Sequence, residues 1–309
     1  MIHKLKGLSK EVYKDYKGQT DKRVFTVKFK QKISKSPVYI SKRTGCVFHK
    51  ANINTPKSLS IWENTIFSNS LDPKKQKYTA NNPIMKSRHN YAANFLINFI
   101  GNNKKNIRVC DYGAGDGNFG LDLISLSKKI HYAFTEDSAK NFLISKKNIT
   151  RIAKKKFLYG FKGSIEDSKK DLRFKNFDFA TLLWTLCNTV DPINVLDAIY
   201  ASLKPNSYLL VSESSRILVP FKKPIKNYFH NKHETNNVHP WHFSYNSISN
   251  LLEICGFRIV KVNRYYDEND LVIIAKKKDK INDIKIYRDN PKKINKFFME
   301  WEKFSKNFS

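Results

Sequence analysis

The sequence predicts an α/β fold, with a doubly wound, mostly parallel sheet of seven strands whose last strand is antiparallel. Two observations support this prediction. Between residues 86 and 276, apolar runs of strand length alternate with amphipathic stretches of helix length, a pattern typical of parallel sheets with helices on both faces. The last two apolar runs follow each other without a helix, so they must pair as an antiparallel hairpin at the edge of the sheet.

Seven apolar runs are expected to form the strands, at residues 107–111, 130–135, 157–162, 177–183, 207–213, 257–264 and 270–275. The spacing of apolar side chains predicts helices over 117–127, 138–148, 192–203 and 244–255. A further amphipathic helix is expected over 87–100, just before the first strand. Its apolar side carries Tyr91, Phe95, Leu96 and Phe99.

Composition divides the chain into three parts. Residues 1–85 are expected to form a basic N-terminal cap, with strand-like runs at 24–29 and 38–41. Residues 86–276 are expected to form the α/β domain, and residues 277–309 a basic C-terminal extension with one helix-like aromatic patch.

The formal net charge of +30 over 309 residues raises the question of a polyanionic partner. Most of this charge comes from Lys, which is spread along the whole chain among Asn and Ile. Arg, the more specific reader of phosphate, is scarce. We therefore interpret the charge as mainly compositional, so nucleic acid is a possible but not a favoured partner.

Features of secretion, membrane insertion and metal binding are missing from the sequence. The first six residues lack the apolar segment of a signal peptide, and no apolar run approaches the length of a membrane span. Cys46, Cys110, Cys187 and Cys255 are scattered without a CxxC pair, and the histidines lack the spacing of an obvious zinc site. A cytoplasmic protein without a metal is expected.

The most informative stretch is VCDYGAGDG, residues 109–117. An apolar run ends in an acid and is followed by glycine at alternate positions, 113, 115 and 117, before a stretch with helical periodicity. This pattern predicts a strand, a tight turn and the start of a helix. Alternate glycines leave no side chain to keep a ligand away from the backbone amides and the positive end of the helix.

Acids on this turn and after the next strand indicate which ligand the turn binds. Glu136 and Asp137 follow the next apolar run, about twenty residues on, where nucleotide-binding α/β folds place a carboxylate on ribose hydroxyls. An adenosine-containing cofactor is therefore expected. Asp111 and Asp116 disfavour a dinucleotide, because a carboxylate repels a pyrophosphate. They suit the sulfonium and ammonium groups of S-adenosylmethionine.

Asp111, Gly113, Gly115 and Gly117 together resemble motif I of the class I S-adenosylmethionine-dependent methyltransferases, an acid followed by G-x-G-x-G. The resemblance covers roughly residues 85–275. It implies a Rossmann-like, seven-stranded sheet with an antiparallel last strand, and S-adenosylmethionine as the cofactor.

The same resemblance implies further cofactor contacts. The loop after the third strand, with Ser164 and Ile165, would flank the adenine, although an acid is common at the position of Ser164. Leu183, at the end of the fourth strand, belongs to the same predicted site. Arg88, on the helix before the domain, would pair with the methionine carboxylate.

Two residues are candidates for catalysis. Glu213 ends the fifth strand, at the edge where ligands bind in open α/β sheets. His239 resembles the histidine that precedes Phe-Ser in methyltransferases acting on nucleotide-linked sugars and glycan precursors, and an imidazole titrates near working pH. Val238 stands where that subgroup has Glu. Cys187-Asn188 stand where many small-molecule methyltransferases have Glu-His.

We therefore expect an enzyme that transfers a methyl group from S-adenosylmethionine to a small, anionic acceptor such as a nucleotide-linked sugar or glycan precursor. Catalysis would rest mainly on proximity and orientation, since the cofactor is already activated. Two alternatives stay open. One is an RNA methyltransferase that uses the basic termini as a phosphate clamp. The other is a non-catalytic binding module of the same fold, suggested by the missing Glu-His and Glu.

Overall fold

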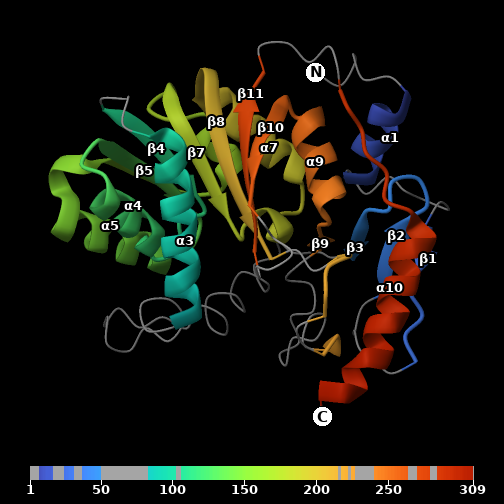
Figure 1. Cartoon of the computed structure of the whole chain (residues 1–309). Helices are drawn as coiled ribbons and strands as arrows, with labels where there is room; N and C mark the ends of the chain where they lie inside the picture. The colour runs from blue at the N-terminus through green and yellow to red at the C-terminus, as the bar shows by residue number, and fades with distance from the viewer. Residues whose placement is uncertain are drawn as a thin grey trace.

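The computed structural model describes ten stretches of the chain, residues 7–16, 24–30, 37–49, 83–101, 106–214, 217–221, 224–226, 240–263, 270–278 and 284–308. These residues form a seven-stranded sheet and a four-stranded sheet (Figure 1). No helix in the described stretches is both long and apolar enough to cross a membrane.

The larger sheet has the strand order β10-β11-β8-β7-β4-β5-β6. Its strands are β4 (Ile107–Tyr112), β5 (Ile130–Glu136), β6 (Phe157–Lys162), β7 (Phe177–Leu183), β8 (Leu203–Glu213), β10 (Phe257–Val262) and β11 (Leu271–Lys277). Strands β4 to β8 pair in parallel, whereas β11 is antiparallel to both β8 and β10. The prediction of a seven-stranded sheet with an antiparallel last strand is confirmed, and the hairpin places β10 at the edge.

Helices cover both faces of this sheet (Figure 1). They are α3 (Pro83–Ile100), α4 (Asn118–Leu126), α5 (Ala139–Ala153), α6 (Ile165–Ser168), α7 (Pro192–Ser202) and α9 (Tyr245–Ile254). Buried side chains of α3 and α4 share one hydrophobic cluster with the sheet, and those of α7 and α9 share the other. Because the strands are buried on both faces, they read as continuous apolar runs in the sequence.

Strand β8 begins at Leu203, four residues before the predicted start at 207. The Pro205-Asn206 pair reads as a turn in the sequence. In the structure, Phe177 of β7 pairs with Leu203 and the register then shifts before Phe179 pairs with Tyr208. This irregularity absorbs the pair, with Asn206 at φ +60°.

The smaller sheet has the order β1-β2-β3-β9 and is antiparallel throughout. Its strands are β1 (Val24–Thr26), β2 (Val38–Ser41), β3 (Val47–His49) and β9 (Trp241–His242), so the last one comes from the segment that follows β8. Helix α10 (Pro291–Phe304) packs Ile294, Phe298 and Trp301 into one hydrophobic cluster with this sheet. Strands β1–β3 from the N-terminal region and helix α10 from the C-terminal region therefore belong to a single unit beside the main sheet (Figure 1).

This smaller unit is joined to the main domain by specific contacts. Tyr16, at the end of α1 (Gly7–Tyr16), donates a hydrogen bond to the backbone oxygen of Ser247 in α9 (2.6 Å). Trp241 of β9 donates its indole N–H to the backbone oxygen of Thr189 (2.8 Å), just after the short helix η5 (Leu186–Asn188). Because η5 follows β7, the smaller unit contacts the main domain at the carboxyl edge of the main sheet.

Candidate cofactor and acceptor site

Those predicted site residues that the structure describes lie near the carboxyl edge of the main sheet. Strands β8, β7, β4 and β5 are neighbours in that order and run in parallel, so their ends lie side by side. In open α/β sheets, ligands bind at this edge, among the loops that follow the parallel strands.

The loop after β4 has all three glycines in the left-handed region, with φ of +73° at Gly113, +59° at Gly115 and +80° at Gly117. A Cβ at Gly113 would lie 2.9 Å from the side chain of Thr185, and one at Gly117 would lie 2.5 Å from Ser145 Oγ. A Cβ at Gly115 would meet nothing within 4 Å. Packing therefore requires the outer two glycines, while the middle one borders open space that a ligand can fill.

Glu136, at the end of β5, reaches this loop directly. One carboxylate oxygen accepts a hydrogen bond from the backbone N–H of Gly115 (2.8 Å) and the other accepts one from Ser138 (3.0 Å). Burial, which leaves the residue 9% exposed, raises the pKa of Glu136 to about 7. Each oxygen keeps a lone pair for a further donor, as contact with ribose hydroxyls requires. The neighbouring Asp137 is exposed.

Asp111 lies below the loop, with 2% of its surface exposed. Its two carboxylate oxygens accept hydrogen bonds from the hydroxyls of Tyr132 in β5 and Thr181 in β7, both at 2.7 Å. Burial raises the pKa of Asp111 to about 6. The acid therefore joins three adjacent strands under the glycine loop, and its attraction for a cationic ligand stays a prediction. The sequence gives no signal for its two partners, since they lie 21 and 70 residues away.

Asp116 is also 2% exposed, and its carboxylate lies at the start of α4. It accepts hydrogen bonds from the backbone N–H (3.2 Å) and the side-chain amide (2.7 Å) of Asn118. Burial raises the pKa of Asp116 to about 7. The first amide of α4, which would otherwise serve an anion, is thus occupied by a carboxylate. This arrangement suits a cationic ligand better than a pyrophosphate.

The loop that was predicted to flank the adenine lies next to Glu136. Gly163 donates its N–H to the backbone oxygen of Glu136 (3.1 Å). Ser164 caps the short α6, because its hydroxyl accepts from the Asp167 N–H (3.1 Å) and donates to the Asp167 carboxylate (2.8 Å). Ile165 is nearly buried beside it. The structure thus brings both residues to the site, and their contact with adenine stays a prediction.

Arg88 of α3 forms an ion pair with Asp270, with Nε 3.0 Å from the carboxylate. The same carboxylate accepts the indole N–H of Trp184 (3.0 Å), whose φ is +50°. Leu183 precedes Trp184 and packs in the same hydrophobic cluster as α3. Arg88 therefore holds α3 against the start of β11, and its predicted pairing with the methionine carboxylate stays untested.

His89, which sequence reasoning missed, lies 5.5 Å from the Trp184 ring, measured between centroids. Burial, with a contribution from Arg88, lowers the pKa of His89 to about 4. The imidazole is therefore neutral at working pH. Its place one residue after Arg88 is the only signal that the sequence offers for it.

Glu213 ends β8 and is 1% exposed. One carboxylate oxygen accepts the backbone N–H of Cys187 (3.2 Å), and the other has no hydrogen-bond partner among the described residues. Burial raises the pKa of Glu213 to about 7, near the value that suits a general base at neutral pH. The second catalytic candidate, His239, lies outside the described residues.

Comparison with known proteins identifies the family of this chain. A family model described as "Methyltransferase domain" matches residues 85–262, which is more than half of the chain. The chain belongs to this methyltransferase family. Its cofactor is S-adenosylmethionine. That the glycine loop, the buried acids and Glu136 bind this cofactor stays a prediction.

Solved structures confirm the fold of this methyltransferase. A protein from Nostoc punctiforme PCC 73102 that is described as an O-methyltransferase aligns with a TM-score of 0.52 and 18% identity, over 66% of this chain and 58% of that one. The Burkholderia thailandensis 1,6-didemethyltoxoflavin-N1-methyltransferase aligns with a TM-score of 0.53 and 15% identity, over 78% and 98%. The CurJ carbon methyltransferase aligns with a TM-score of 0.53 and 15% identity, over 70% and 60%. No curated protein matches the sequence.

Proposed function

We propose that this methyltransferase transfers the methyl group of S-adenosylmethionine to a small, anionic acceptor such as a nucleotide-linked sugar or a glycan precursor. One observation supports cofactor binding and therefore the transfer reaction. Gly115 borders open space, and its backbone N–H donates a hydrogen bond to the Glu136 carboxylate at the same edge of the sheet. By their descriptions, the three aligned proteins methylate oxygen, nitrogen and carbon. The fold is therefore compatible with each kind of acceptor atom.

The residues at this edge would bind and orient the cofactor. Glu136 would accept hydrogen bonds from the ribose hydroxyls, and the buried Asp111 and Asp116 would favour the cationic end. The bound cofactor supplies an activated methyl group. The main contribution of the protein is then to hold the acceptor atom in line with that methyl group, which removes much of the entropic barrier.

Proton removal from the acceptor falls to Glu213 or His239. Glu213 has a raised pKa and a carboxylate oxygen without a hydrogen-bond partner in the described part of the chain. It ends β8, beside the loop of β7 that carries Cys187 and Asn188. His239 rests on the sequence resemblance alone.

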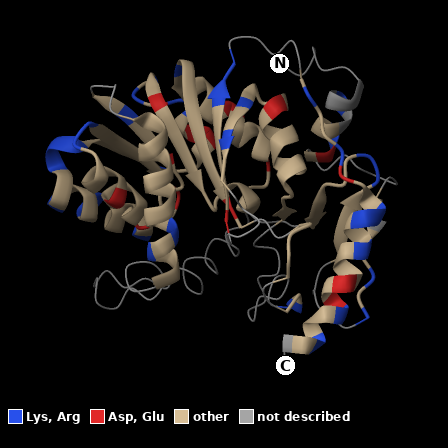
Figure 2. Cartoon of the chain, in the orientation of Figure 1, with Lys and Arg blue, Asp and Glu red and all other residues tan. Residues whose placement is uncertain are grey.

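A small acceptor is favoured over RNA by the placement of several lysines. Lys128 and Lys129 precede β5, and Lys154–Lys156 (η4) precede β6, so these five residues lie at the amino edge of the sheet. Figure 2 shows Lys and Arg on the side of the molecule that carries α5. An RNA held at the amino edge would lie across the sheet from Glu136 and Glu213.

The salt dependence of turnover also distinguishes the two acceptors, because the rate of RNA methylation would fall steeply as the salt concentration rises.

Methyl transfer from labelled S-adenosylmethionine to a panel of nucleotide-linked sugars, glycan precursors and RNA tests this proposal. We expect turnover with a small acceptor, which Glu213→Gln or His239→Ala reduces while the affinity for S-adenosylhomocysteine stays unchanged. Asp197→Asn, at an exposed acid of α7, is the control. Turnover with RNA alone would contradict the proposal, as would cofactor binding without turnover on any member of the panel.

A further inference from the structure

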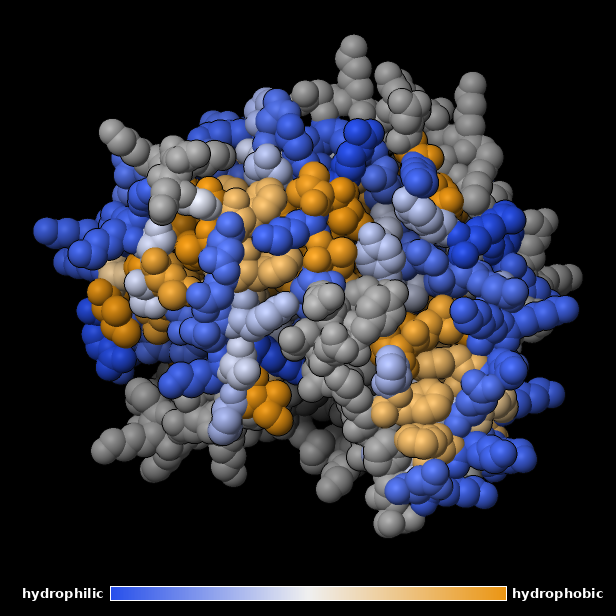
Figure 3. Space-filling view, in the orientation of Figure 1, coloured by the Kyte–Doolittle hydropathy of each residue, from blue (hydrophilic) through white to orange (hydrophobic). Residues whose placement is uncertain are grey.

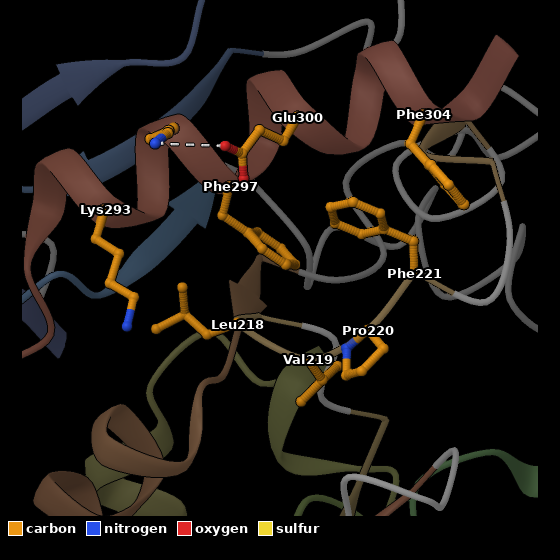
Figure 4. A pocket seen from close by; sticks show the side chains of 9 residues that line it. Leu218, Val219, Pro220, Phe221, Lys293, Phe297, Glu300 and Phe304 are labelled. Atoms are coloured by element: carbon orange, nitrogen blue, oxygen red, sulfur yellow. Dashed lines mark ion pairs between the residues drawn. The ribbon is translucent and has the colours of Figure 1, made fainter.

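An open groove is lined by α10 and by residues 218–221, in the segment that follows β8 (Figure 4). Its volume is about 620 Å³, which lies within the range of sites that hold drug-sized ligands. Its lining residues are Leu218, Val219, Pro220, Phe221, Lys293, Lys296, Phe297, Glu300 and Phe304. None of them belongs to the glycine loop or to the other cofactor-binding positions.

The floor of the groove is aromatic. Phe221 stacks on Trp301, with ring centroids 5.6 Å apart and an interplanar angle of 15°. Its ring centroid also lies 5.2 Å from that of Phe297 and 5.4 Å from that of Phe304. Figure 3 shows a hydrophobic area beside α10, bordered by hydrophilic side chains. Phe304 is 41% exposed, so part of this apolar floor faces solvent.

One wall of the groove has a strained backbone. Leu218 has φ +63°, a conformation that Leu rarely adopts. Its side chain lines the groove and points towards Lys293 (Figure 4). Such backbone geometry persists only where the surroundings fix it, and it concentrates at ligand-binding segments.

The rim of the groove carries positive charge. Lys296 pairs with Glu300 at 3.6 Å, whereas Lys293 makes no ion pair with any described residue. Lys293 interacts electrostatically with Asp289, but the Asp289 carboxylate already accepts hydrogen bonds from Ser244 and Asn246. Lys293 also stands in the first turn of α10, where the helix dipole disfavours a cation. Its ammonium group is therefore well placed to bind an anion.

Resting on the proposed methyl transfer, we propose that this groove binds the hydrocarbon chain of an amphipathic phosphate, and that this lipid-type carrier holds the acceptor group. The aromatic floor takes the chain, and Lys293 takes the phosphate. A nucleotide carrier needs polar partners for its base and sugar, and the described lining residues include two Lys and one Glu against six apolar side chains. Leu218 follows Glu213 by five residues, at most about 18 Å of extended chain. One elongated ligand can therefore reach from the groove to the carboxyl edge of the sheet.

Calorimetric titration of the full chain with decyl phosphate, below its micelle concentration, tests this inference. Decanol, inorganic phosphate and uridine monophosphate serve as comparison ligands. Lys293→Met removes the charge at the rim, and Lys292→Met is its matched control, because Lys292 is exposed on the same turn and does not line the groove. Phe304→Ala shortens the apolar floor, and Leu172→Ala is the matched control at an exposed apolar residue elsewhere.

We expect decyl phosphate to bind more tightly than each comparison ligand. Lys293→Met should weaken binding about tenfold, since it removes a charge-assisted contact, and Phe304→Ala should also weaken it. Both controls should retain the wild-type affinity. Equal affinity in Lys293→Met, tighter binding of the nucleotide, or no binding of decyl phosphate would overturn the inference. Titration of the same samples with S-adenosylhomocysteine separates the two claims, because loss of that binding would instead contradict the proposed function.

Discussion

Glu136 accepts a hydrogen bond from the backbone N–H of Gly115 at 2.8 Å, which joins the end of β5 to the glycine loop that follows β4. Gly115 is also the loop glycine that borders open space. The acid that would hold the ribose is therefore fixed against the backbone that would lie under the ligand. Cofactor affinity should depend on both residues.

At a pH above 7, where Glu136 with its pKa of about 7 is charged, replacing it by Gln should weaken binding of S-adenosylhomocysteine about tenfold or more, because a charged acceptor of hydroxyl groups becomes a neutral one. Asp197→Asn, at an exposed acid of α7 outside the predicted site, should leave the affinity close to that of the wild type. Calorimetric titration of the two variants side by side measures the difference. Equal affinities would remove Glu136 from the site.

The buried charge of Glu136 should also make stability depend on pH. Its pKa is about 7 in the folded chain and about 4.3 in an unfolded one. Between these values the folded state binds more protons than the unfolded state, so this residue lowers stability as pH rises. Glu136→Gln removes that contribution, so the variant should gain stability relative to the wild type from pH 5 to pH 7. His89, whose lowered pKa acts in the opposite direction, cancels in the comparison.

Thermal unfolding of both proteins across that pH range, without cofactor, measures the effect. A difference in midpoint that stays constant with pH would show that Glu136 ionises normally in the folded chain.

Removing a hydrogen bond to the buried carboxylate of Asp111 should lower the stability of the fold without altering its surface. Tyr132→Phe removes one of its two hydroxyl donors and leaves a buried carboxylate oxygen unpaired, which should cost about 1–3 kcal/mol. Tyr91→Phe is a suitable control, because no hydrogen bond of that hydroxyl occurs among the described residues. Urea unfolding gives both free energies. A Tyr132→Phe variant as stable as the control would mean that Asp111 does not need this donor.

Arg88 has two possible partners, Asp270 in the structure and the methionine carboxylate that the resemblance implies. If Arg88 binds that carboxylate, Arg88→Met should weaken S-adenosylhomocysteine but not methylthioadenosine, which lacks the amino-acid end. Titration with both ligands distinguishes the roles. Unchanged affinity for both would leave Arg88 as a purely structural partner of Asp270.

The order of strands and helices could be predicted because the sheet is buried on both faces, so each strand appears as an apolar run bounded by turn residues. The glycine loop was also readable, since its left-handed backbone leaves glycine as the residue that fits. Strand β8 shows the limit of such reading. Pro205-Asn206 signals a turn, whereas the structure places these residues in an irregular part of the strand.

Contacts between distant segments could not be predicted. Strand β9 pairs with β3 across nearly two hundred residues, and α10 packs on β2 from the other end of the chain. The groove beside Phe221 arises from the same long-range packing. The roles of Asp111 and Asp116 were predicted from their charge alone, whereas the structure shows that hydrogen bonds from Tyr132, Thr181 and Asn118 occupy their carboxylates.

The most direct test of the account compares two glycines with S-adenosylhomocysteine as the ligand. Gly115 and Gly101 have similar backbones, with φ +59° and +64°, and a Cβ at either would meet nothing within 4 Å. Gly115→Ala and Gly101→Ala should therefore lose a similar amount of stability, on the order of 1 kcal/mol. Only Gly115→Ala should lose affinity for the ligand. Equal affinity in the two variants would contradict a cofactor seated on the glycine loop.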